Sequence, residues 1–198
     1  MIEPYQWLQK NQTFIGIINK DSLQPASLDL HLGDSVVIMR ISFNPIRWLK
    51  FFLWKRKKIT NHQDLVRNNL IIRKEVSLEN KGSILCLPLR LYILHSQEYI
   101  KIDHEHAALL FLRSTTGREG FSHNMAGYFD PGFEGNGVLE VTTIIPGFLH
   151  KNQRIAQLAY VKLTEKTDKP YNGKYKAQKG AQEALREKYL DKYIVGKR

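Results

Sequence analysis

Most of the chain consists of short apolar segments separated by turn residues. The segments are rich in Val, Ile, Leu, Phe and Tyr and are too short for helices of globular proteins, so each predicts a β-strand. Pro-Gly and Asn-Gly pairs at 131–132, 136–137 and 146–147 indicate turns between them. The predicted strands are 35–41, 83–87, 89–94, 107–112, 137–145 and 157–163. This spacing predicts a mainly β fold: a sandwich, a jelly roll or a distorted barrel.

Three segments depart from the strand pattern. Good helix formers cluster at 5–11 and 181–193, which we predict to be helical. The segment 44–69 begins with Asn-Pro, contains four aromatic residues and carries Lys or Arg at every position from 55 to 58. Its apolar residues do not alternate as in a half-buried strand. We interpret about 42–70 as a partly helical insertion in a single domain, 1–198, with a basic tail at about 164–198.

The composition is that of a globular protein. A length of 198 residues suits one domain, and a 42% apolar share is enough to form a core. The single cysteine, Cys86, rules out an internal disulfide framework, and we expect it in the core. No apolar run approaches the ~18 residues of a membrane span, and no signal peptide is recognisable. We therefore expect a soluble, cytoplasmic protein.

The net charge of +11 is unevenly distributed. Residues 40–58 hold seven basic and no acidic residues, and residues 162–198 hold eleven basic and five acidic ones. The rest of the chain, with 12 basic and 14 acidic residues, is nearly neutral. Because a protein that binds nucleic acid usually presents a basic face over its body, we expect no nucleic-acid partner.

Two acidic residues lie close together in the sequence and could carry chemistry. Glu140 stands in the apolar run 138–141, where burial would raise its pKa and make it a useful base, although a solvent-facing strand carboxylate is an open alternative. Asp130 begins the segment Asp-Pro-Gly-Phe, which predicts a type II turn with Gly132 at the position of positive φ. Such a turn would hold Asp130 rigidly; the alternative is an aspartate that only closes its own turn.

The segment 113–118 (Arg-Ser-Thr-Thr-Gly-Arg) follows a predicted strand. Its two arginines and three hydroxyl groups could hold phosphate oxygens, although a solvated turn before a helix starting near Thr115 explains them equally well. His104 and His106 would share a strand face and could bind a metal, but surface histidines without that role are common. The cations and aromatic residues of 171–180 suit either a ligand contact or a disordered tail.

Several motifs taken together resemble the dCTP deaminase branch of the dUTPase-like superfamily. They are QPASLDLHLG at 24–33, RSTTGREG at 113–120, AGYFDPGFEGNGVLEV at 126–141, RIAQL at 154–158 and PYNGKYKAQKG at 170–180. The resemblance runs from about residue 21 to residue 180, apart from the region near 42–70. It implies a distorted β-barrel or jelly roll with short helices. It also implies a homotrimer with active sites at the contacts between subunits.

The resemblance assigns roles to individual residues. Glu140 matches the catalytic glutamate that activates water for attack on C4 of cytosine, and Ser114 and Arg118 match polar residues at the reaction centre. Asp130 matches the aspartate that binds the 3′-hydroxyl of deoxyribose. The other substrate-binding matches are Val138, the backbone of Ala126, and the triphosphate-binding positions Arg113, Thr115, Tyr171, Lys174 and Gln178. Magnesium would enter with the triphosphate, and no zinc would be used.

Within this family the sequence favours deamination of dCTP to dUTP and ammonia. Ala126–Gly127 resembles the bifunctional branch, which goes on to dUMP and pyrophosphate, so that reaction is the first alternative. A catalytically silent relative that senses nucleotides or binds a protein is the second. The chain departs from the usual family pattern at Glu119, Met125 and Lys151–Asn152, which leaves room for altered specificity.

The insertion lies outside the resemblance. Residues 46–58 place two tryptophans, two phenylalanines and two leucines among six basic residues. This mixture suits contact with an anionic membrane surface. It also suits a protein contact, since Trp and Arg are frequent anchors. A third interpretation packs the aromatic residues onto the barrel and leaves the lysines solvated.

Overall fold

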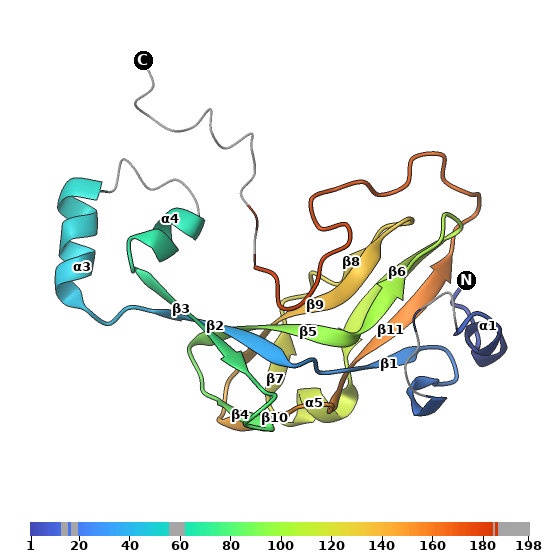
Figure 1. Ribbon diagram of the computed structural model, residues 1–198, viewed down its shortest axis with the longest axis horizontal. Helices are drawn as coiled ribbons and strands as arrows, with labels where there is room; N and C mark the ends of the chain where they lie inside the picture. The colour runs from blue at the N-terminus through green and yellow to red at the C-terminus, as the bar shows by residue number, and fades with distance from the viewer. Residues whose placement is uncertain (13–15, 17–19, 56–61, 184, 186–198) are drawn as a thin grey trace, which may run out of the picture.

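Two antiparallel β-sheets enclose the main hydrophobic core (Figure 1). The computed structural model describes residues 1–12, 16, 20–55, 62–183 and 185. One sheet has the strand order β3-β2-β5-β9-β7, the other β1-β11-β6-β8, and β10 pairs with β4. The strands are β1 (Leu28–His31), β2 (Ser35–Ile41), β3 (Ile71–Ser77), β4 (Ser83–Cys86), β5 (Arg90–Lys101), β6 (His106–Leu112), β7 (Phe121–His123), β8 (Tyr128–Phe129), β9 (Glu134–Thr143), β10 (Gly147–His150) and β11 (Arg154–Lys162).

The helices are short and lie outside the sheets. They are α1 (Tyr5–Lys10), the 3-10 turn η1 (Lys20–Ser22), α3 (Pro45–Lys50), the π-helical turn η2 (Phe51–Lys55), α4 (His62–Arg67) and α5 (Ser114–Arg118). No described helix is long and apolar enough to cross a bilayer. The mainly β fold is therefore confirmed, and the insertion is partly helical, as expected.

Strand β9 shows how the sequence places side chains on two faces. Its residues alternate strictly between buried and partly buried positions. Leu139 and Val141 point into the main core, whereas Val138 and Glu140 lie on the opposite face, because successive side chains of a strand point to opposite sides. That outer face carries a second, smaller apolar cluster around Met39 of β2 and Ile93 of β5.

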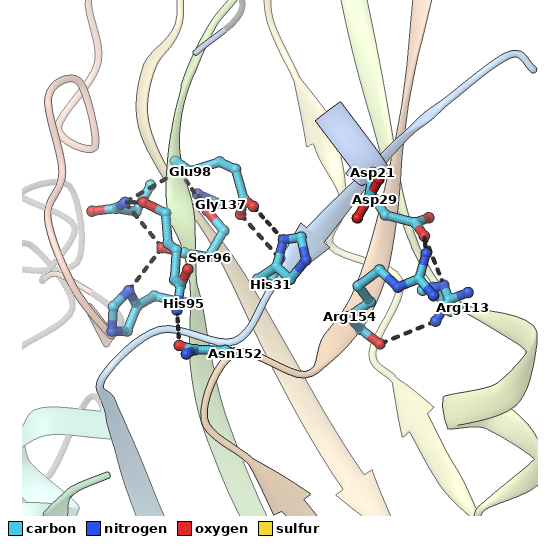
Figure 2. A network of polar contacts seen from close by, with 12 residues as sticks. Asp21, Asp29, His31, His95, Ser96, Glu98, Arg113, Gly137, Asn152 and Arg154 are labelled. Carbon is cyan, nitrogen blue, oxygen red and sulfur yellow. Dashed lines mark hydrogen bonds and ion pairs between the residues drawn. The ribbon is translucent and has the colours of Figure 1, made fainter. Parts of the chain in front are cut away.

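A polar cluster holds the start of β9 against β5. The pairing of these strands is irregular between His95 and Tyr99. There the Ser96 hydroxyl donates to the Glu98 carbonyl oxygen (2.7 Å) and accepts from the Gly137 amide (2.8 Å). The Glu98 carboxylate, almost fully buried, contacts the ring of His31 on β1 at 2.6 Å (Figure 2). These bonds satisfy the polar groups that the irregular pairing would otherwise leave without partners.

All six predicted strands are present, but five others went unrecognised: β1, β3, β7, β8 and β10. The prediction of 89–94 was too short, since Leu89 has a positive φ of 60° before β5 and the strand continues to Lys101. The predicted helix at 5–11 corresponds to α1. The predicted helix at 181–193 is wrong at 181–183 and 185, which are not helical, and its remaining residues lie outside the described part.

The segment after β11 crosses the outer face of the five-stranded sheet instead of extending into solvent. The Tyr171 amide donates to the Pro131 carbonyl oxygen (2.7 Å). Further along, the Gln178 side chain donates to the Asn136 carbonyl oxygen (2.9 Å) and the Asn136 amide donates to the Gln178 carbonyl oxygen (3.0 Å). Residues 171–183, which we call the tail strap, thus cover part of the second apolar cluster.

Candidate functional site

A cavity of about 510 Å³ lies on the outer face of the five-stranded sheet, beneath the tail strap. A volume of this size is typical of pockets for small molecules. Strands β2, β5 and β9 form its floor, and the turn before β9 and the tail strap form its walls. Its lining residues are Met39, Leu91, Ile93, Ala126, Tyr128, Phe129, Asp130, Phe133, Val138, Glu140, Tyr171, Tyr175, Gln178, Gln182 and Glu183.

Glu140 is the carboxylate on the floor of this cavity. It pairs with Ile93 across β5 and β9, next to the apolar cluster around Met39. Burial raises the pKa of the Glu140 carboxyl, because desolvation disfavours the charged form. Its Oε2 atom is buried and has no hydrogen-bond partner among the described residues. A half-buried carboxyl with a raised pKa and an oxygen without a partner among the described residues has the properties of a proton acceptor or donor.

His123 stands beside Glu140 and was missed by the sequence reasoning. Its Nε2 atom lies 3.9 Å from Glu140 Oε2, and its side chain is only 3% exposed. Burial lowers the pKa of the His123 imidazole, and both ring nitrogens lack a partner among the described residues. Only the pairing of β7 with β9, which no sequence pattern indicated, brings the two side chains together.

The turn before β9 has the predicted geometry. The Phe133 amide donates to the Asp130 carbonyl oxygen (3.1 Å), and Gly132 has a φ of 84°, as a type II turn requires. Ala126 and Asp130 both line the cavity. Between them, a Cβ atom on Gly127 would lie 2.3 Å from the Leu110 carbonyl oxygen. Glycine at 127 therefore lets this segment approach β6 closely.

The tail strap supplies two of the predicted ligand-binding residues. Tyr171 and Gln178 line the cavity, as does Tyr175, which the sequence reasoning did not single out. Lys174 does not line it. Its Nζ atom donates to the Leu185 carbonyl oxygen (3.1 Å) and lies 5.0 Å from the centre of the Tyr175 ring. The strap thus brings the rings of Tyr171 and Tyr175 and the polar side chains of Gln178, Gln182 and Glu183 to the cavity wall.

A second polar group surrounds Asp29 of β1 (Figure 2). This aspartate is completely buried, and its Oδ2 atom lies 3.1 Å from Arg113 Nε and 3.4 Å from Arg154 Nη1. The Gln157 side chain donates to its other oxygen (3.3 Å). Asp29 therefore fixes Arg113 directly before α5, the helix on which Ser114, Thr115 and Arg118 are exposed.

The predicted site residues fall into two groups within one chain. The cavity brings together Ala126, Asp130, Val138, Glu140, Tyr171 and Gln178. No residue of α5, and neither Arg113 nor Lys174, is among the described residues that line it. The chain therefore presents two separate groups of the residues expected at one reaction centre.

The other candidates have structural partners. His106 is buried, bonds to Asp103 and Glu3 at 2.8 and 3.1 Å and packs against Trp7. His104 precedes β6, so the expected pair on one strand face is wrong. Within the described ranges no three His, Cys, Asp or Glu side chains gather as a metal site. Cys86 is a free, buried core residue, as predicted, and burial raises its pKa to about 12.

Comparisons with known proteins agree on one family. A family model described as dCTP deaminase-like matches residues 6–163. A curated relative from Sulfurihydrogenibium sp. (strain YO3AOP1), named dCTP deaminase, dUMP-forming, is 33% identical over 160 residues and spans 80% of this chain and 79% of its own. A relative of the same name from Methanosphaera stadtmanae is 30% identical over 174 residues and spans 84% of this chain and 81% of its own.

Among solved structures, the chain is similar to 2′-deoxycytidine 5′-triphosphate deaminase from Agrobacterium tumefaciens. The TM-score is 0.57 at 21% identity, over 80% of this chain. The match covers 47% of that protein, so this chain spans about half its length. At this identity the likeness shows the fold alone.

Asp29→Asn tests the ion pairs before α5. Removal of this buried charge leaves Arg113 and Arg154 without their anion, so we expect the free energy of unfolding to fall by about 3 kcal/mol. The control Lys151→Gln breaks the Lys151–Glu79 pair at the surface and should change the free energy of unfolding by less than about 1 kcal/mol. Urea unfolding of both variants measures the difference, and equal losses would contradict a structural role for Asp29.

Proposed function

The chain belongs to the dCTP deaminase-like family, and on that premise we propose that it deaminates dCTP by hydrolysis and converts the product to dUMP and pyrophosphate. The half-buried Glu140 carboxyl on the floor of the cavity is the observation that carries the proposal. Both curated relatives described above are named dUMP-forming. The bifunctional reaction, the first alternative from the sequence, therefore fits better than release of dUTP.

Glu140 would act as the base in the deamination. Its carboxylate takes a proton from water, and the resulting hydroxide attacks C4 of cytosine to form a tetrahedral adduct. The protonated carboxyl then gives that proton to the amino group, which leaves as ammonia, and the proton of the C4 hydroxyl moves to N3 as the C4 carbonyl of uracil forms. A raised pKa suits both steps, since the group must accept a proton and then donate it near neutral pH.

The cavity walls suit the nucleoside part of the substrate. Val138 and Ile93 offer an apolar surface to the base, and Ala126 also lines the cavity. Asp130, held on its type II turn, would accept a hydrogen bond from the 3′-hydroxyl of deoxyribose. Tyr171 and Gln178 of the tail strap, which also line the cavity, would contact the triphosphate.

A second copy of the chain would supply the other group of residues, as the family's homotrimer implies. The surface beside α5 supports this proposal because it is apolar and exposed: Leu85, Ile144, Ile145 and Phe148. The Ile144 amide donates to the Gly120 carbonyl oxygen (3.3 Å), so this surface adjoins the end of α5. Burial of this patch between copies would bring Ser114 and Arg118 to a neighbouring Glu140.

The proposed arrangement also gives Arg113 and Thr115 a role. Forked guanidinium donors and hydroxyls bind phosphate oxygens well, and Asp29 orients Arg113. Magnesium would bind through the triphosphate, as the resemblance to the family implies, since phosphate oxygens are ligands that Mg²⁺ prefers. Bound there, it would neutralise charge on the triphosphate. The single cysteine makes the usual cysteine-ligated zinc site of cytosine deaminases unavailable, so we propose zinc-independent chemistry.

The reaction itself is tested by incubating the purified protein with dCTP and magnesium. We expect ammonia, dUMP and pyrophosphate to form without accumulation of dUTP. Ion-exchange chromatography separates and measures the nucleotides. A zinc-selective chelator should leave the rate unchanged. Stoichiometric dUTP would identify the deaminase-only reaction. Absence of ammonia, or loss of activity that added zinc restores, would overturn the proposal.

Glu140→Gln tests the base. The amide keeps the shape of the side chain but cannot take the proton, so turnover should fall by roughly 10²-fold or more while nucleotide still binds. In the wild type, kcat should decline as the pH falls through the Glu140 pKa, because only the ionised form is a base. Since burial raises this pKa, the decline should lie above the range of an ordinary glutamate. A mutant within a few-fold of wild type would remove Glu140 from this role.

Mixed assemblies test whether two copies build one site. Glu140→Gln and Arg118→Ala should each be nearly inactive alone. In a cyclic trimer that contains both variants, one site of the three would combine an intact Glu140 with an intact Arg118. Equal co-expression should therefore recover about a quarter of wild-type activity. If light scattering shows that trimers form but the mixture is no more active than either variant alone, both residues act within the same copy.

A further inference from the structure

The insertion carries an exposed helical segment that the proposed reaction does not use. We call residues 43–55, which comprise α3 and η2, the aromatic arm. It lies between β2 and β3, apart from the four-stranded sheet (Figure 1). The Asn44 side chain accepts from the Ile46 amide (3.0 Å) and begins the helix, as is common at helix starts. The Trp48 indole donates to the Ser42 carbonyl oxygen (2.7 Å) and fixes the arm to its base.

One face of the arm is apolar and open to solvent. Ile46, Leu49, Phe52 and Leu53 follow the spacing of a single helix face. Together with Phe43 their exposed fractions range from 57% to 77%. Neither core cluster contains a described residue of the arm. The interpretation in which the aromatic residues pack onto the barrel is therefore wrong for this face. An exposed apolar surface of this kind usually has a partner.

The charge around this face is of one sign. Arg47 and Lys50 are exposed on the remaining side of the helix. Across residues 40–58 the sequence has seven basic residues and no acidic one. An exposed apolar face on a segment whose only charged residues are Lys and Arg is typical of helices that lie in the interface of an anionic membrane, with aromatic rings at the headgroup level.

We propose that the aromatic arm binds the protein to the surface of an anionic lipid bilayer. The helix lies in the plane of the interface: Ile46, Leu49 and Phe52 enter the headgroup boundary, and Arg47 and Lys50 face the lipid phosphates. No described helix is able to span the bilayer, so the attachment is peripheral. A protein partner would need a negatively charged surface to complement the basic residues of the arm. An anionic bilayer presents such a surface everywhere.

Vesicle flotation tests the arm with a matched control. The wild-type protein should float with phosphatidylcholine vesicles that contain phosphatidylserine, and high salt should weaken this binding. Leu49→Glu should lower the bound fraction by roughly tenfold, because a charge on the apolar face opposes insertion. Leu89→Glu makes the same change of charge at a leucine that is 86% exposed on the barrel and should bind as the wild type does. Deamination of dCTP should be equal in all three proteins, which separates this test from the proposed function.

Three results would overturn the proposal. The first is a wild-type protein that stays at the bottom of the gradient. The second is equal flotation of the Leu49→Glu and Leu89→Glu variants, which would mean that net charge alone attracts the protein. The third is capture of a protein partner that depends on Leu49 without any binding to vesicles, which would make the arm a protein-docking element.

Discussion

The alternation of side chains along β9 is the constraint on which the candidate site depends. Leu139 and Val141 are required in the core, and this requirement turns Val138 and Glu140 toward the cavity. A slip of one residue would bury Glu140 and expose the leucine, so the packing of the core fixes the register of the base. The bonds from Ser96 to Gly137 and Glu98 hold this register at the start of the strand. The same alternation of residues in β9 therefore determines both the packing of the core and the placement of the Glu140 carboxyl.

Close approaches of the backbone complete the site around that strand. Gly127 permits the turn segment to pack against the Leu110 carbonyl oxygen, where a Cβ atom would collide. Gly135 plays the same part under the tail strap, because a Cβ atom there would lie 3.0 Å from the Gln178 side chain and backbone, and its φ of 147° suits glycine. These glycines let two loops lie directly on the sheet, which brings Asp130, Tyr171 and Gln178 to one cavity.

The sequence predicted the parts of the site that local patterns determine. Short apolar segments between turn residues indicated the longer strands, and Asp-Pro-Gly-Phe indicated the turn that carries Asp130. The short strand β7 has no such pattern, so the contact between His123 and Glu140 depends on a pairing between distant segments and was not foreseen. The resemblance implied sites at subunit contacts but did not divide the site residues into groups, so the separation of α5 from the cavity within one chain was not foreseen. The non-helical residues 181–183 follow the sheet surface rather than their intrinsic propensity.

The electrostatics of Glu140 and His123 connect the proposed assembly to the proposed chemistry. Burial raises the pKa of the Glu140 carboxyl and lowers that of the His123 imidazole, because desolvation disfavours the charged form of each group. A neutral imidazole 3.9 Å away gives the carboxylate none of the stabilisation that a cation would provide. In the proposed assembly, Arg118 of the neighbouring copy supplies this positive charge and favours the ionised carboxylate, which is the form that acts as a base. The same guanidinium would also stabilise negative charge that develops on the tetrahedral adduct. Assembly would then contribute to catalysis in two ways, by completing the cavity and by favouring the ionised form of its base.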